Sequence, residues 1–117
     1  MKRLLIAAAV LLAPAAASAA DLSGAWKFNL NIAGMMIPLA CTFTETGQTL
    51  GGNCDGADGK PAAVTGAVDG SKVTWAYDTV YQGMPMHVAY TGELKTDTTI
   101  AGALDASGNA GTFDGSK

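Results

Sequence analysis

Strict alternation of large apolar side chains with polar or small ones restricts the fold of this chain more than any other feature of its sequence. In residues 26–32 the even positions are apolar and the odd positions are polar. A two-residue period recurs in residues 37–43, 73–81 and 84–90. Successive side chains of a β strand point to opposite faces, so this period indicates half-buried strands of an antiparallel sheet. Residues 21–117 contain no 3.6-residue apolar repeat, and no amphipathic helix is expected there.

Turn-forming residues separate the alternating segments. Asp69-Gly70 and Gln82-Gly83 each stand between two such segments, as hairpin turns do. The connections are short, so successive strands are expected to be neighbours in the sheet. Such an antiparallel meander closes most simply into an all-β up-and-down barrel, which leaves no free edge. Eight strands are predicted, near residues 24–32, 36–44, 48–54, 61–69, 72–81, 84–93, 98–104 and 109–114.

The two halves of the chain resemble each other. Residues 26–42 align with residues 75–91 at an offset of 49, which matches one tryptophan with the other. Residues 66–72 match residues 111–117 at an offset of 45. This similarity predicts a barrel built from two four-strand pseudo-repeats. The alternative is that hairpin sequences resemble each other by composition alone.

The first 20 residues have the three parts of a secretory signal peptide. Two basic residues follow Met1, an apolar run spans residues 4–13, and small residues occupy positions 17–20. The apolar run is shorter than the roughly 20 residues that span a bilayer, although an uncleaved anchor is the alternative. We expect residues 1–20 to be removed and residues 21–117 to form a single domain, periplasmic or secreted, with no stable membrane insertion after cleavage.

The charge of the expected mature chain restricts its partners. Residues 21–117 carry five basic and ten acidic residues, a net charge of −5 at pH 7. An acidic surface repels phosphate backbones and anionic membrane surfaces. Nucleic acid is therefore not expected as a partner.

The two cysteines lie in the part of the chain expected to be exported, where disulfides persist. Cys41 and Cys54 flank the predicted turn at residues 45–48, and a hairpin centred on Gly47-Gln48 places them opposite each other. A structural disulfide is therefore predicted. The alternative, a redox-active pair, lacks both a C-x-x-C motif and a helix N-terminus that would lower a thiol pKa.

The two-residue period also predicts which side chains point into the barrel. If Trp26 points inward, every aromatic side chain of residues 21–117 does so. The inward glycines either allow a strand to bend, make room for a ring from across the lumen, or leave a cavity. The predicted inward aromatics are Trp26, Phe28, Phe43, Trp75, Tyr77, Tyr81, Tyr90 and Phe113, and the inward glycines are Gly52, Gly66, Gly92, Gly102 and Gly111.

Catalytic constellations are not evident in the sequence. The single histidine, His87, is predicted to point outward with no adjacent Ser or Cys nucleophile. Asp78 and Glu93 have no acidic partner at a catalytic spacing. No phosphate-binding loop or cofactor motif occurs. We therefore expect a protein that is not an enzyme and has no cofactor.

Methionines near the predicted turns at residues 33–35 and 82–83 raise the question of copper. Thioether and imidazole groups are soft ligands suited to Cu(I). The period places Met84 and Met86 inward and His87 outward, so one strand cannot deliver all three to one ion. A site formed by Met35, Met84 and Met86 remains the alternative. Methionine as an adaptable apolar filler is the favoured interpretation, and no metal is expected.

The opening of the expected mature chain resembles a known group of barrels. The first predicted strand begins Asp21-Leu-Ser-Gly24-Ala-Trp26, and Gly-x-Trp is similar to the first-strand motif of the calycins. These are the lipocalins, the avidins and the small exported metalloprotease inhibitors of bacteria. The resemblance implies an eight-stranded meander barrel of a small secreted bacterial protein. In the first two families ligands enter at the barrel mouth.

Three functions from different classes follow from these observations. The favoured one is a carrier or sensor of a small apolar ligand, held at the mouth where residues 33–35, 55–60, 82–83 and 105–109 are expected. The alternatives are a protein-binding module, such as a periplasmic protease inhibitor, and a methionine-based copper binder. The residues expected to contact a ligand are Ile32, Met35, Tyr77, Tyr81, Met84, Met86 and Tyr90.

Overall fold

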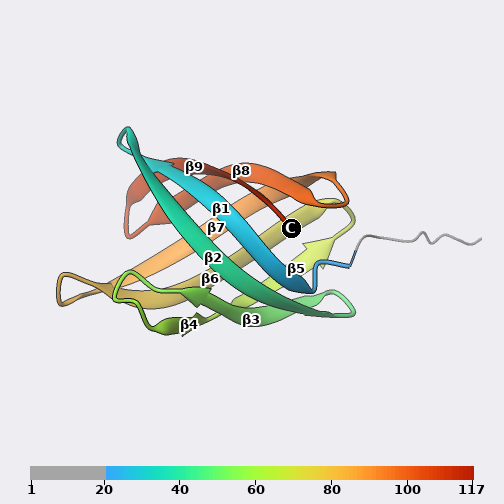
Figure 1. The fold of residues 1–117 in the computed structure, drawn as a ribbon, viewed down its shortest axis with the longest axis horizontal. Helices are drawn as coiled ribbons and strands as arrows, with labels where there is room; N and C mark the ends of the chain where they lie inside the picture. Colours follow the sequence, from blue (N-terminus) through green and yellow to red (C-terminus); the bar gives the residue numbers. More distant parts are fainter. Residues whose placement is uncertain (1–20) are drawn as a thin grey trace, which may run out of the picture.

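A computed structural model describes residues 21–117, and the expected signal peptide, residues 1–20, lies outside the described residues. None of the described residues belongs to a helix that is long and apolar enough to cross a membrane. The strands follow one another through short turns (Figure 1). They are β1 (Gly24–Ile32), β2 (Met35–Thr46), β3 (Thr49–Asp55), β4 (Pro61–Ala63), β5 (Thr65–Asp69), β6 (Lys72–Tyr81), β7 (Met84–Thr96), β8 (Thr99–Ala106) and β9 (Asn109–Ser116).

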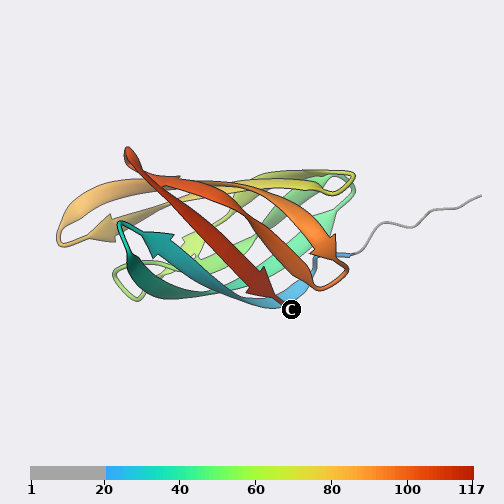
Figure 2. The same cartoon turned by 90° about the horizontal axis from the view of Figure 1, so that it is seen from above.

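The strands form a closed antiparallel barrel, as predicted. Except for β4 and β5, consecutive strands pair with each other, and β1 also pairs with β9, which joins the two ends of the sheet. β4 and β5 pair with successive parts of β3 and together take the place of one strand, so the barrel has eight strand positions. Figure 2 shows the strands wrapping around a common axis. Unpaired edges remain where strands extend beyond their neighbours and between β4 and β6.

The predicted single strand over residues 61–69 is wrong, because the ladder is interrupted at Val64. The cause lies opposite, at Gly52, whose φ of +118° is an unfavourable backbone conformation for other residues. A Cβ at Gly52 would lie 2.0 Å from the carbonyl oxygen of Thr42. The Val64 N–H still donates to the Gly52 carbonyl at 2.9 Å, so the strand bends without leaving the sheet.

Seven of the eight aromatic side chains predicted to point inward are buried, and the eighth, Tyr81, shares their strand face but lies in solvent. Tyr81 is 51% exposed because it ends β6 beyond the rest of the barrel. β5 pairs with β6 only up to Ala76, and β8 pairs with β7 only from Val88. The outer part of the β6–β7 hairpin therefore has no hydrogen-bonded strand on either side.

Aromatic rings fill the lumen. The seven buried rings contact one another with centroid separations from 4.7 Å (Trp75–Tyr90) to 6.3 Å (Trp26–Phe43). Glycines on the inner face make room for them. A Cβ at Gly92 would lie 2.8 Å from Cζ of Phe113, closer than two non-bonded carbons approach. Gly92 therefore makes room for a ring, which is one of the three roles expected for the inward glycines.

The N-terminal segment of the described chain closes one end of the barrel. Leu22 is fully buried, and its carbonyl accepts a 2.8 Å hydrogen bond from Nε1 of Trp26. The Leu22 N–H donates to Oε1 of Glu45 at 2.8 Å. Nζ of Lys117 donates to the carbonyl of Asp21 at 2.7 Å and so ties the two ends of the domain together. We call this the plugged end, which also carries the turns at residues 47–48, 70–71 and 97–98.

We predict that Leu22→Ala lowers the free energy of unfolding by about 2–5 kcal/mol, because it leaves a cavity beneath Trp26. Met36→Ala, which shortens a 62% exposed side chain, is the matched control and should change stability little. Urea denaturation followed by tryptophan fluorescence measures both. Equal midpoints for the two variants would show that the N-terminal segment is not part of the core.

The predicted disulfide is confirmed. Cys41 and Cys54 face each other on β2 and β3, with their Cα atoms 3.9 Å apart, and both are buried. We predict that the double variant Cys41→Ala/Cys54→Ala loses about 3 kcal/mol of unfolding free energy, because the crosslink no longer restricts the unfolded chain. Urea denaturation without reductant compares it with the parent. An unchanged midpoint would contradict a stabilising role.

Candidate binding site at the apolar end

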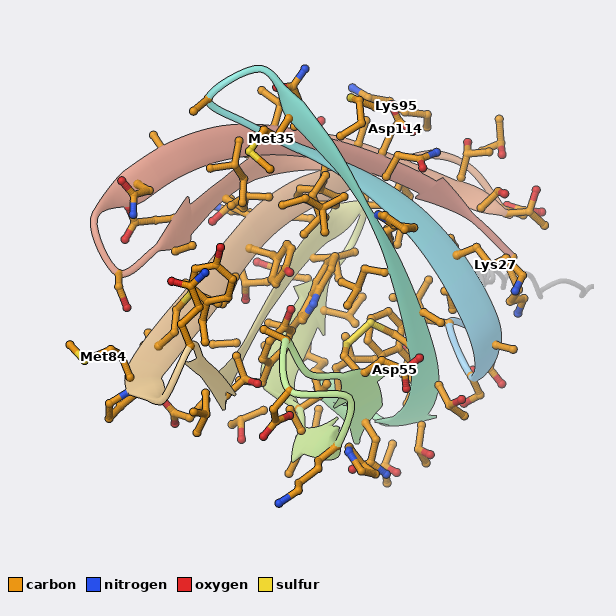
Figure 3. All side chains as sticks on the ribbon, turned by 60° about the vertical axis from the view of Figure 1, so that its left-hand side comes forward. Lys27, Met35, Asp55, Met84, Lys95 and Asp114 are labelled. Carbon is orange, nitrogen blue, oxygen red and sulfur yellow. A yellow bond between two sulfur atoms is a disulfide. The ribbon has the colours of Figure 1, made fainter. Side chains whose placement is uncertain are left out.

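Two hairpins project at the end of the barrel opposite the plug (Figures 1 and 3). One is the tip of β1–β2, where β2 residues 35–40 have no β3 partner. The other is the tip of β6–β7, residues 78–87. Ala33-Gly34 and Gln82-Gly83 form their turns, all four with positive φ, as in the tight turns that suit the twist of paired strands. We call this the apolar end.

The exposed large apolar side chains of residues 21–117 all lie on these two tips. Met35 is 64% exposed and Met84 is 67% exposed. Four of the six belong to the same strand face as Trp26 or Trp75, so they continue the inner face of the barrel into solvent. These four are Met35, Ile37, Tyr81 and Met84, and the other two are Met36 and Val80.

The structure divides the residues predicted to contact a ligand into two groups. Ile32, Met35, Tyr81, Met84 and Met86 lie on the two tips, where Ile32 and Met86 are partly buried against the core. The other two, Tyr77 and Tyr90, are buried among the rings of the lumen. Sequence reasoning missed Met36, Ile37 and Val80. The two-residue period contained a signal for Ile37, which shares a face with Met35.

The two buried tyrosines satisfy each other. The hydroxyl groups of Tyr77 and Tyr90 are 2.7 Å apart, and the Tyr90 ring stacks on Trp75 at 4.7 Å. Burial raises the pKa of both hydroxyl groups above the usual value for tyrosine. The pair therefore stays protonated and forms a polar contact within the core.

A proline removes one main-chain N–H donor from the free edge of each projecting hairpin. The short Cα separation of Cys41 and Cys54 is typical of a non-hydrogen-bonded pair, so the Cys41 main chain points toward β1. Pro38, at the alternate position, therefore faces the free edge of β2 and offers no N–H there. On β7, the His87 carbonyl accepts a hydrogen bond from the Ser107 N–H, so the main-chain polar groups of His87 point toward β8. Pro85, two residues earlier, faces the same edge beyond the end of β8 and has no N–H to offer there. Both edges are poor templates for an added strand.

The loop between β3 and β4 is fastened to the β6–β7 hairpin. The Ala57 N–H donates to Oγ1 of Thr79 at 3.0 Å. Beside this contact lies a shallow, open hollow of about 390 Å³. It is lined by Asp58, Lys60, Pro61, Ala62, Asp78, Thr79, Val80 and Pro85.

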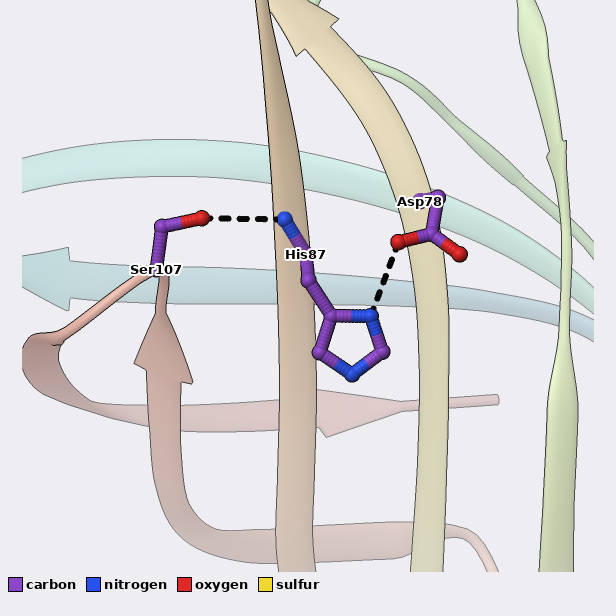
Figure 4. A network of polar contacts seen from close by, with 3 residues as sticks. All are labelled: Asp78, His87 and Ser107. Atoms are coloured by element: carbon purple, nitrogen blue, oxygen red, sulfur yellow. Dashed lines mark hydrogen bonds and ion pairs between the residues drawn. The ribbon is translucent and has the colours of Figure 1, made fainter.

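Asp78, His87 and Ser107 form a polar network on the outer surface (Figure 4). Nδ1 of His87 lies 2.9 Å from Oδ1 of Asp78, and both side chains are exposed. The Ser107 hydroxyl accepts a hydrogen bond from the main-chain N–H of His87 rather than contacting the imidazole. The serine is therefore not activated by the histidine, and the network links β6, β7 and the β8–β9 turn.

Metal-binding geometry is not apparent at this end. Among residues 21–117, no three His, Cys, Asp or Glu side chains are grouped to hold a metal ion. Met35 and Met84, two members of the alternative copper set, lie on separate hairpin tips (Figure 3).

The barrel is similar to a redesigned β-barrel, b11L5F_LGL, with a TM-score of 0.61 over 82% of this chain and 90% of that chain. The two sequences are 20% identical, so the similarity concerns the fold alone. No protein-family model matches the chain, and no curated protein does.

We predict that Tyr77→Phe lowers the free energy of unfolding by about 1–3 kcal/mol, because it leaves the Tyr90 hydroxyl buried without a partner. The double variant Tyr77→Phe/Tyr90→Phe removes both hydroxyl groups and should be closer to the parent. Alkaline pH gives a second readout. The unfolded chain ionises both tyrosines near pH 10, while the folded chain retains the protons, so stability is full below about pH 10 and falls above it.

The double variant should therefore lose less stability than the parent between about pH 9 and pH 11. Urea midpoints across this range measure the difference. Parallel pH profiles for the parent and the double variant would contradict the assignment of the pair.

Proposed function

We propose that this protein is a binding protein, not an enzyme, that engages an apolar surface of a partner protein through the side chains of its apolar end. The carrying observation is that every exposed large apolar side chain of residues 21–117 lies on the two hairpin tips there. Clustered exposed apolar side chains are typical of interaction sites. Methionine is common on surfaces that adapt to partners, since its side chain is flexible and polarizable.

The filled lumen favours a protein partner over an enclosed small molecule. Sites for small molecules bury most of the ligand surface. Here the seven buried aromatic rings fill the lumen, so only the mouth is left for a ligand. A protease inhibitor is one form of this function, and its contacts would come from the hairpin tips, because residues 21–23 are engaged at the plugged end.

A carrier or sensor of a small apolar ligand is the second candidate. Ile32 and Met86, which are only partly buried, would supply the floor of a shallow site between the tips. The resemblance of Gly24-x-Trp26 to calycin barrels also favours it. A methionine-based copper site would need the two tips to approach each other. For all three candidates, the Cys41–Cys54 disulfide is consistent with an oxidising, exported location.

Methyl NMR titration with short apolar peptides and with fatty acids tests the proposal. We expect the methyl resonances of Met35 and Met84 to shift saturably with a peptide. The double variant Met35→Ser/Met84→Ser should weaken binding by at least about tenfold, since burying one methionine contributes about 1.5–3 kcal/mol. Thr46→Ser/Thr98→Ser at the plugged end is the control and should bind like the parent.

Saturable shifts with fatty acids alone would favour the carrier over the protein-binding function. Shifts centred on Leu22 and Trp26, with the methionine variant binding normally, would contradict a site at the apolar end.

A further inference from the structure

The reactive sulfur of the described chain is concentrated at the apolar end. All four methionines of residues 21–117 lie on the two hairpin tips, Met35 and Met36 at the start of β2 and Met84 and Met86 at the start of β7. The two cysteines form a buried disulfide, so residues 21–117 contain no free thiol. The thioethers are therefore the sulfur atoms of this part of the chain that an oxidant can modify.

Burial divides the four methionines into two classes. Met35, Met36 and Met84 are between 62% and 67% exposed. Met86 is partly buried against the core and pairs across the hairpin with Thr79, which is buried. An oxidant in solution reaches the first three without any opening of the barrel. Met86 is an internal reference, because it is the same residue type on the same hairpin but is shielded.

We propose that Met35, Met36 and Met84 form a reversible oxidation site, at which hydrogen peroxide converts the apolar end into a polar surface and so prevents binding there. This inference concerns the regulation of the apolar end and rests on the proposed function. In each step an S–O bond forms as the O–O bond of the peroxide breaks. The thioether sulfur loses two electrons and becomes a sulfoxide, and the peroxide gains them and leaves as water.

Oxidation at these positions changes much of the exposed apolar surface. Three of the six exposed large apolar side chains of residues 21–117 are these methionines. A sulfoxide is polar, and its formation disrupts surfaces that bind through methionine. Met35 and Met84 lie on different tips (Figure 3), so both hairpins lose apolar character.

The fold is protected from the same reaction. Among residues 21–117, the fully buried core contains no methionine, and both tryptophans are buried. A sulfoxide on Met35, Met36 or Met84 adds a polar group in solvent rather than in the lumen, so the barrel should stay folded. The exposed sulfoxides also remain accessible to methionine sulfoxide reductases, which return them to thioethers at the expense of thiols.

Graded treatment with hydrogen peroxide, followed by tandem mass spectrometry of peptide fragments, tests the site. We expect each of the three exposed methionines to gain one oxygen, about 16 Da, while Met86 stays mostly unmodified. The oxidised protein should elute earlier from a hydrophobic interaction column and keep the urea midpoint of the parent. Equal oxidation rates at all four methionines, an unchanged elution or a lower urea midpoint would overturn the inference.

A leucine variant is the matched control. Met35→Leu/Met36→Leu/Met84→Leu keeps the apolar surface but cannot be oxidised there, so peroxide should change neither its elution nor its peptide binding. In the parent, peroxide should weaken binding of a short apolar peptide by about tenfold or more. Reductases for both sulfoxide epimers, with dithiothreitol, should restore this binding, and dithiothreitol alone should not. An equal loss in the leucine variant would overturn the inference.

The outcomes separate this inference from the proposed function. Failure of apolar peptides to shift the methyl resonances of the unoxidised parent would overturn the proposed function, and with it the regulatory role, whatever the oxidation pattern. Peptide binding that persists after full oxidation of Met35, Met36 and Met84 would overturn the regulatory role while the proposed function stands.

Discussion

Phe28 and Trp75 meet near the axis of the barrel, with their ring centroids 5.4 Å apart. Each also contacts Phe43 and Phe113, so rings from four strands pack into one cluster. A closed sheet of eight positions has an interior just wide enough for such side chains. The cluster joins both halves of the meander, and Gly92 and Gly115 leave the space that the rings of Phe113 and Phe28 occupy.

This packing also decides where the protein can meet other molecules. The buried rings fill the centre of the barrel, and Leu22 covers Trp26 at the plugged end. The strands of two hairpins nevertheless extend beyond the cluster. There the inner face continues without a partner across the lumen, and Met35 and Met84 lie in solvent. The exposed apolar end follows from strands that are longer than the core they surround.

Much of the fold could be predicted because it depends on local rules. The two-residue period identified the buried face, and the position of Cys41 and Cys54 about one turn identified the register of β2 and β3. The break at Val64 could not be predicted in this way, because it depends on the backbone conformation of Gly52 on another strand. The two-residue period did not predict the burial of Leu22 either, because Leu22 precedes the first strand and is held by hydrogen bonds to Trp26 and Glu45.

The sequence by itself determined which side chains share a face, where the chain turns and which cysteines pair, because these properties depend on spacing along one or two strands. Tertiary structure alone decided how far each strand extends past its neighbours. Tyr77 and Tyr81 share one face of β6, yet the first is buried beside Tyr90 and the second is half exposed. The period is the same at both positions, and the difference arises because β5 and β8 end before the tip of the β6–β7 hairpin is reached.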